Sequence, residues 1–218
     1  MESGTAGARQ PGSDIAGFFN PRSVAVAGAS RSGMKLGNVP IANMRRFGYR
    51  GRVLPIHPEA GEVMGLRAYP SPAAVGEEID VAVAVIPRER IAGFIEECAD
   101  AGVRRVIVTA AGFADSGADG ARLQRELERK ARGFGVRMIG PNSVGTISTE
   151  SGFVTSLLTL ERVRPGGVSI VAQTGLFAAG YARWRSPKAS RTFILRARPP
   201  TRAAGSHRSS RRASSRRA

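Results

Sequence analysis

Residues 23–38 read Ser-Val-Ala-Val-Ala-Gly-Ala-Ser-Arg-Ser-Gly-Met-Lys-Leu-Gly-Asn. This stretch predicts a buried strand that enters a glycine-rich turn and then a helix, an arrangement that offers backbone N–H groups to a phosphate. The spacing is G-x-S-x-x-G, with Ser30 at the position where a dinucleotide fingerprint needs glycine for close approach of the pyrophosphate. The turn therefore favours a nucleotide-like ligand other than NAD.

The end of the next predicted strand also disfavours NAD. A dinucleotide enzyme has Asp or Glu on the ribose about 20 residues after the glycines. Here the strand at 52–56 ends in His57 and Pro58, and the nearby carboxylate, Glu59, lies past the strand. An NAD(P)-binding Rossmann protein stays open as an alternative, as does a turn that only closes a strand-to-helix connection.

Strands and helices alternate along the body of the chain. Such alternation predicts an α/β fold with a Rossmann-like, doubly wound parallel sheet. Glycines at 48 and 102 are expected to end two of the helices. Strands are expected at 24–27, 52–56, 80–86, 104–109 and 136–139, and helices at 39–47, 88–101 and 120–132.

The composition is that of a globular protein. The chain has 218 residues, of which 42% are hydrophobic, enough for one full domain and part of another. It contains no apolar run of the roughly 18 to 20 residues that a membrane span needs, and its N-terminus does not resemble a secretory signal. A cytoplasmic location is expected. The single cysteine, Cys98, is expected to be a small core residue and to bind no metal.

The net charge of +16 is concentrated at the C-terminus. Residues 183–218 contain 12 basic and no acidic residues, which leaves 21 basic and 17 acidic residues in 1–182. Residues 186–218 have almost no apolar periodicity and are expected to be disordered. Two interpretations stay open: a basic arm that binds nucleic acid or another anionic surface non-specifically, or the product of a shifted reading frame in GC-rich DNA.

Seven short motifs follow one another in order, at 21–30, 53–58, 69–71, 80–87, 111–113, 140–145 and 173–175. The most specific is Gly140-Pro-Asn-Ser-Val-Gly145. Together they resemble the N-terminal part of the NDP-forming acyl-CoA synthetases, the superfamily that includes the succinyl-CoA ligase alpha subunit, over residues 15–182. The resemblance implies coenzyme A as the ligand.

The resemblance also implies a domain organisation. Residues 15–145 correspond to a CoA-binding Rossmann-like domain, preceded by a disordered N-terminus at 1–14. Residues 146–185 correspond to the start of a flavodoxin-like ligase domain, with a strand at 167–172 and a helix from 176 to about 184. The ligase pattern stops there, so a truncated synthetase is expected, followed by the low-complexity tail at 186–218.

The predicted CoA site combines the glycine-rich turn with the loops that follow other strands. Backbone N–H groups of 29–33 and the hydroxyls of Ser30 and Ser32 are candidates for the phosphates. Arg31 and Lys35 either add positive charge or are solvated surface cations. Asn142, in the loop that by resemblance faces the thiol end, is able to hydrogen-bond a carbonyl or phosphate. The predicted cofactor-binding residues are Gly28, Ala29, Ser30, Arg31, Ser32, Gly33, Lys35, Ile86, Pro87, Gly112 and Asn142.

The resemblance implies an acid–CoA ligase reaction that passes through a phosphorylated histidine and an ATP-grasp domain or subunit. The two histidines, His57 and His207, match no catalytic position of the family. Where the family often carries Asn and Lys at the end of the second strand, this chain has His57 and Glu59, so contacts to the adenosine end of CoA are expected to differ. We expect CoA binding without catalysis. The alternative is a non-catalytic CoA sensor or interaction module with a basic tail.

Overall fold

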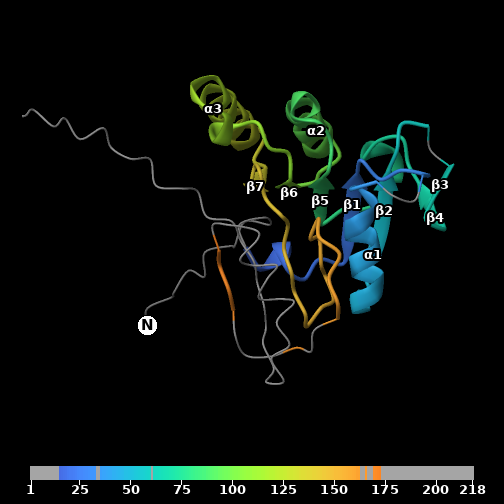
Figure 1. Cartoon of the computed structure of the whole chain (residues 1–218). Coiled ribbons are helices and arrows are strands. Elements are labelled where there is room, and N and C mark those ends of the chain that lie inside the picture. Colours follow the sequence, from blue (N-terminus) through green and yellow to red (C-terminus); the bar gives the residue numbers. More distant parts are fainter. Residues whose placement is uncertain (1–14, 33–34, 60, 163–164, 166–168, 173–218) are drawn as a thin grey trace, which may run out of the picture.

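The computed structural model describes residues 15–32, 35–59, 61–162, 165 and 169–172. Its centre is a five-stranded parallel sheet with strand order β2-β1-β5-β6-β7 (Figure 1). The strands are β1 (Ser23–Ala27), β2 (Arg52–Ile56), β5 (Val81–Ala84), β6 (Arg105–Val108) and β7 (Arg137–Ile139), and the helices are α1 (Asn38–Phe47), α2 (Arg88–Asp100) and α3 (Ala118–Gly133). The predicted doubly wound sheet is confirmed, and each expected strand and helix of the body is present with ends shifted by a few residues.

Alternate residues of the central strands face opposite layers, as the two-residue repeat of a strand requires. Ala25 and Ala27 of β1 belong to the core under α2 and α3. Val24 and Val26 belong to the core on the other face, which also contains Ile41 of α1. Figure 1 shows α2 and α3 on one side of the sheet and α1 on the other. The two faces are therefore covered by different helices, which is what "doubly wound" means.

A short hairpin between β2 and β5 was not expected from the sequence. Strands β3 (Gly61–Val63) and β4 (Leu66–Ala68) pair antiparallel. The two residues between them, Met64 and Gly65, both have positive φ, 53° and 73°, as in the tight turns that suit the twist of a hairpin. Met-Gly is not one of the turn pairs that signal a hairpin in a sequence, and strands of three residues are too short to show alternation. The remaining short elements are the 3-10 helices η1 (Ile15–Phe18), η2 (Ala73–Val75) and η3 (Ala114–Ser116).

The chain after β7 packs back onto α1. Phe153 is fully buried, with its ring 5.4 Å from the ring of Tyr49. Ile147, Val154 and Leu160 form a small core with Phe47, the last residue of α1. Asn43 of α1 fixes the same segment, because its side chain donates to the carbonyls of Ser156 and Leu158 and accepts from the amide of Leu160. Residues 147–160 are thus built into the body of the sheet domain.

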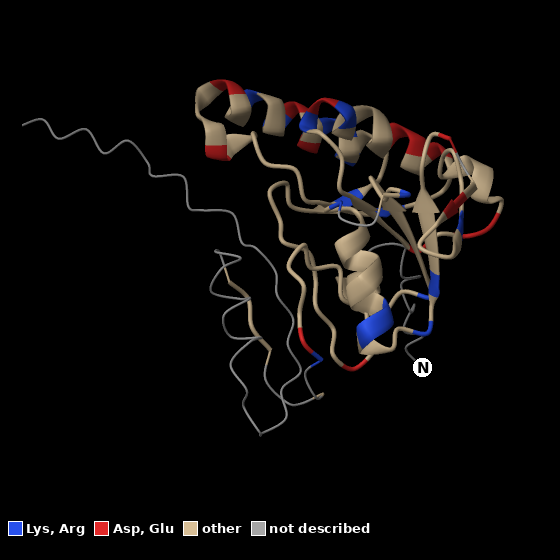
Figure 2. Ribbon diagram, turned by 45° about the vertical axis from the view of Figure 1, so that its right-hand side comes forward, with Lys and Arg blue, Asp and Glu red and all other residues tan. Residues whose placement is uncertain are grey.

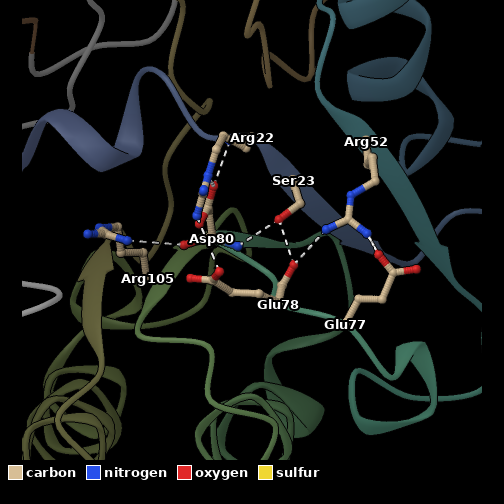
Figure 3. Close-up of polar contacts among 7 residues, drawn as sticks. All are labelled: Arg22, Ser23, Arg52, Glu77, Glu78, Asp80 and Arg105. Carbon is tan, nitrogen blue, oxygen red and sulfur yellow. Dashed lines mark hydrogen bonds and ion pairs between the residues drawn. The ribbon is translucent and has the colours of Figure 1, made fainter.

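Polar contacts join the amino ends of the strands (Figure 3). The Asp80 carboxylate accepts the Arg22 backbone N–H at 2.6 Å, and the Asp80 amide donates to the Ser23 hydroxyl at 3.0 Å. That hydroxyl donates in turn to the Glu78 carbonyl, which also accepts from Arg52. These bonds tie β1, β2 and the entry to β5 together at one edge of the sheet. The carboxyl ends of the strands lie at the opposite edge of the sheet.

The remaining expectations concern the termini. Residues 169–172, the described part of the strand expected at 167–172, contain no regular element. The expected helix from 176, the N-terminal segment 1–14 and the tail at 186–218 lie outside the described residues. Within the described part of the chain, no helix has both the length and the apolar character needed to cross a membrane.

Candidate functional site

A cleft of about 540 Å³ lies at the carboxyl ends of β1, β2 and β5. In open α/β sheets this edge is where ligands bind, at the point where the strand order reverses. That point here is β1, because β2 lies on one side of it and β5 on the other. The walls consist of strand ends (Ala27, Gly28, Ala29, Ile56, Ile86), a loop (His57, Pro58, Pro70, Ser71) and α2 (Glu89, Arg90, Gly93, Phe94, Glu97).

Gly28 closes the end of β1 against β5. Its φ is +92°, and a Cβ built on it would lie 1.9 Å from the carbonyl oxygen of Val85. Gly37 approaches the same turn from the other side, because its Cβ would lie 1.9 Å from the carbonyl oxygen of Gly28. Both positions need glycine for the backbone to come this close. Both contacts are with protein backbone, so they explain the glycines of a tight turn, and the binding of a phosphate there stays a prediction.

Asn38, the first residue of α1, shapes the turn. Its side chain is 3% exposed. Its Oδ1 accepts the Ser30 amide at 2.9 Å, and its Nδ2 donates to the carbonyls of Ser30 and Ser32 at 2.9 and 3.2 Å. The hydroxyls of Ser30 and Ser32 lie 2.9 Å apart. Asn38 therefore holds both serines of the turn in one conformation.

These bonds narrow the choice of phosphate donors in the turn. The Ser30 amide is used by Asn38, and the Ser32 amide donates to the Ser30 hydroxyl at 3.3 Å. The amides of Ala29 and Arg31 donate to no residue that the structure describes. The first two amides of α1 donate to the carbonyls of 35 and 36, and the third residue is proline. Among the described residues here, amides without a protein acceptor thus lie in the turn itself rather than at the start of α1.

The charges around the cleft are mixed. Arg31 forms an ion pair with Glu59, which joins the glycine-rich turn to the loop after β2. In that loop the Glu59 amide donates to Nδ1 of His57 at 3.2 Å. On α2, the pKa of Glu89 is held below its ordinary value by a hydrogen bond from its own backbone N–H and by Arg88. Acidic and basic residues are interspersed along α3 (Figure 2). In α2 the arginines lie in the first turn, and residues 95–100 include acidic but no basic residues.

The predicted site residues divide into three groups. Gly28, Ala29 and Ile86 line the cleft. Ser30, Arg31, Ser32 and Lys35 lie beside it in the turn, and Pro87 immediately precedes α2. Gly112 and Asn142 lie in the loops after β6 and β7, where the Gly112 carbonyl accepts from Arg88 at 2.7 Å and the Asn142 amide donates to the carbonyl of Ala110 at 2.8 Å. Gly33 lies outside the described residues.

Two residues of the site, Asn38 and Gly93, carried no role in the sequence prediction. Asn38 directly follows the last glycine of the turn, where an asparagine also fits an ordinary helix start. Gly93 lies in the middle of α2, and a single glycine inside an amphipathic pattern signals only a weaker helix. No motif or residue spacing in the sequence identifies either residue, because each joins the site only through the three-dimensional fold.

Two further hollows in the described part of the chain contain none of the predicted site residues. One of about 530 Å³ lies between α2 and α3 and is lined by Ala92, Leu123 and Leu127 among others. Another, of about 600 Å³, lies at the amino edge of the sheet around residues 48–51. Among the residues described, no group of three or more His, Cys, Asp or Glu side chains is arranged to hold a metal ion.

The chain matches a family model described as a CoA binding domain over residues 22–149. It is 35% identical to an ADP-forming acetate–CoA ligase II of Archaeoglobus fulgidus over 75% of this chain and 24% of that protein. It is 36% identical to an ADP-forming acetate–CoA ligase II subunit alpha of Pyrococcus furiosus over 75% of this chain and 35% of that subunit. The chain therefore spans about a quarter to a third of the length of these curated relatives.

Solved structures agree with the sequence relatives. The apo form of a dinucleotide-forming acetyl-coenzyme A synthetase 1 from Candidatus Korarchaeum cryptofilum superposes with a TM-score of 0.77 and 31% identity, over 84% of this chain and 39% of that one. The expected resemblance to ADP-forming acyl-CoA synthetases is thereby confirmed. The curated relatives named above are ADP-forming acetate–CoA ligases. The chain thus belongs to the family of CoA-binding domains, whose ligand is coenzyme A.

Proposed function

We propose that this chain binds coenzyme A, or its acyl thioester, in the cleft at the carboxyl ends of β1, β2 and β5, with phosphates at the glycine-rich turn. The observation that carries the proposal is the coincidence of that cleft with the turn around Gly28 at the point where the strand order reverses. The turn amides of Ala29 and Arg31, which donate to none of the described residues, and the serine hydroxyls would supply donors for a phosphate.

The cleft fits the ligand in chemistry as well as in place. Apolar residues of the lining include Ile56, Ile86 and Phe94, and the lining also contains polar and charged residues (His57, Ser71, Glu89, Arg90 and Glu97). Cofactor sites combine apolar walls with a few polar groups in this way. Space is also left open on the α2 wall at Gly93, where a Cβ would meet no atom within 4 Å. When bound, coenzyme A supplies a thiol that carries an acyl group. The chain's own residues bind and orient it.

The role in a larger assembly is a further part of the proposal. One relative is named as an alpha subunit, and the chain spans only part of each relative above. We propose that the ligase reaction of such proteins needs a further domain or subunit of the ATP-grasp type, and that this chain contributes CoA binding. No catalytic step is assigned to His57, which lies in the cleft wall and hydrogen-bonds its own loop.

Calorimetric titration of the 218-residue chain with CoA and with NAD tests the proposal. CoA is expected to bind more tightly than NAD for two reasons. Ser30 replaces the fingerprint glycine, and β2 does not end in the Asp or Glu that would bind the ribose of NAD. Tighter binding of NAD would overturn the assignment.

A matched pair of arginine variants locates the binding at the turn. Arg31 and Arg122 are both exposed and each pairs with a glutamate, Glu59 and Glu126. Arg31→Gln is expected to weaken CoA binding roughly two- to fivefold at low salt, the scale of one exposed charge contact. Arg122→Gln on α3 makes the same change of charge away from the cleft and should leave the affinity unchanged. Equal losses in both variants would mean that only the net charge matters.

A further inference from the structure

The hollow of about 530 Å³ between α2 and α3 has an apolar floor. Phe113, just after β6, and Leu127 of α3 are each 4% exposed and belong to the core under these helices. Ala92 of α2 and Leu123 of α3 are half-buried and complete the apolar lining. Because alanine is small, the space beside it stays open, and a larger side chain at position 92 would enter it. The volume is typical of sites for small molecules.

The hollow is bounded at both ends by contacts of its charged residues. Lys130 of α3 donates to Glu96 at 2.7 Å, which joins the two helices about one turn beyond Ala92. At the other end of the hollow, Arg88 donates from Nη1 to the carbonyl of Gly112 at 2.7 Å. A space with these limits suits a small molecule better than a helix or an extended segment of another protein.

The rim of the hollow contains a cation without a counter-ion in the described part of the chain. Glu89 of the lining pairs with Arg88 at 2.9 Å. Glu126 pairs with Arg122 at 2.8 Å. Arg129 of α3 also lines the hollow, is exposed, and forms no ion pair or hydrogen bond with a residue that the structure describes. A guanidinium beside an apolar floor is complementary to a carboxylate attached to an apolar chain.

We propose that the hollow between α2 and α3 is a second binding site, which takes a monocarboxylate with an apolar chain. The chain lies on Phe113, Leu123 and Leu127, and the carboxylate pairs with Arg129. The site is separate from the cleft at the carboxyl ends of β1, β2 and β5, with which its lining shares Glu89. The inference goes beyond the proposed CoA function and does not depend on it.

An NMR titration of the 218-residue chain with octanoate tests the proposal. Octanoate is expected to shift the amide signals of 92 and 123–130, whereas acetate, which lacks the apolar chain, should not shift them at the same concentration. Octylamine, which is a cation at neutral pH, should bind at least about fivefold more weakly. Equal responses to octanoate and acetate, or equal affinities for octanoate and octylamine, would overturn the proposal. Shifts confined to the arginine-rich residues 183–218 would overturn it as well.

A matched pair of arginine variants locates the carboxylate. Arg125 and Arg129 are both exposed on α3, and neither pairs with a described residue, but of the two only Arg129 lines the hollow. Arg129→Gln is expected to weaken octanoate binding about two- to fivefold at low salt. Arg125→Gln makes the same change of charge and should leave the affinity unchanged. Equal losses in the two variants would contradict the pairing with Arg129.

A second pair of variants tests the apolar space. Ala92→Leu fills part of the hollow and is expected to weaken octanoate binding about tenfold or more. Ala118→Leu adds the same side chain at the exposed start of α3, outside the lining, and should leave the affinity unchanged. CoA should not displace octanoate from the wild-type chain. Displacement by CoA, or an unchanged octanoate affinity in Ala92→Leu, would overturn the inference, whereas failure of the wild-type chain to bind CoA would overturn the proposed function instead.

Discussion

Two buried asparagines of α1 have different roles, although each makes three side-chain hydrogen bonds. Asn38 bonds the glycine-rich turn, and Asn43 bonds the segment 156–160. Asn38→Ala is expected to weaken CoA binding about tenfold, because the turn loses its fixed shape before the phosphate arrives. Asn43→Ala should lower the free energy of unfolding by about 1–3 kcal/mol, because buried backbone groups of 156–160 lose their hydrogen-bond partner. It should change the CoA affinity little.

Calorimetry and chemical denaturation of both variants separate the two roles. The expected pattern is a loss of affinity in one variant and a loss of stability without loss of affinity in the other. Asn38→Asp is a second test of the role of Asn38. It keeps the acceptor for the Ser30 amide but places a negative charge beside the proposed phosphate site. Its affinity for CoA should recover partly as salt is added. Identical CoA affinities for wild type and Asn38→Ala would contradict the role assigned to Asn38.

Cys98 is expected to be chemically silent in the folded protein. Its side chain is fully buried in the core under α2, and burial, with a smaller contribution from Glu97, raises the pKa of its thiol. Iodoacetamide at pH 8 should therefore modify the chain only after unfolding in urea. Because the unfolded thiol ionises near pH 8.5 and the folded one does not, this group makes the free energy of unfolding fall as pH rises above that value. Rapid modification of the native protein would show that α2 is less closely packed.

At the level of elements, the segment after β7 tests where the domain ends. The boundary predicted at 145/146 remains a prediction, and the packing of 147–160 on α1 leads us to propose that the CoA-binding body extends to Leu160. Phe153→Ala is expected to lower the free energy of unfolding by about 3–5 kcal/mol, the usual cost of emptying a buried phenylalanine site. Leu158, 40% exposed in the same segment, is the control, and Leu158→Ala should change stability by less than about 1 kcal/mol. Similar urea midpoints for both variants would restore the earlier boundary.

The elements differ in how well the sequence predicts them. The buried β-strands and the amphipathic α2 follow directly from continuous apolar runs and from the spacing of Ile91, Phe94, Ile95 and Cys98. The β3–β4 hairpin depends on a two-residue turn at Met64 and Gly65 whose composition gives no hairpin signal. Segment 147–160 has no regular element to predict and is held by single side chains such as Asn43 and Phe153. Local pattern therefore predicts the sheet, and tertiary contacts decide the rest.

For the whole molecule, the family motifs and the alternation of strands and helices predict a ligand at the carboxyl edge of the sheet, where the structure has a cleft. They do not give the walls of the cleft. Gly28 is visible in the sequence as part of a turn, whereas Gly93 and His57 become neighbours of that turn only when α2 and the loop after β2 are folded onto the same edge. Sequence order separates these residues by dozens of positions, and no spacing rule connects them.

Hydrogen exchange of the 218-residue chain with and without CoA tests the central claim most directly, because the sheet has two distinct edges with a hollow at each. We predict that CoA slows exchange in residues 27–32 and 86–97, which form the turn and the α2 wall of the cleft. Residues 48–51, at the amino edge, should exchange at the same rate with and without the ligand. Protection confined to 48–51, with the turn and α2 unaffected, would contradict the account.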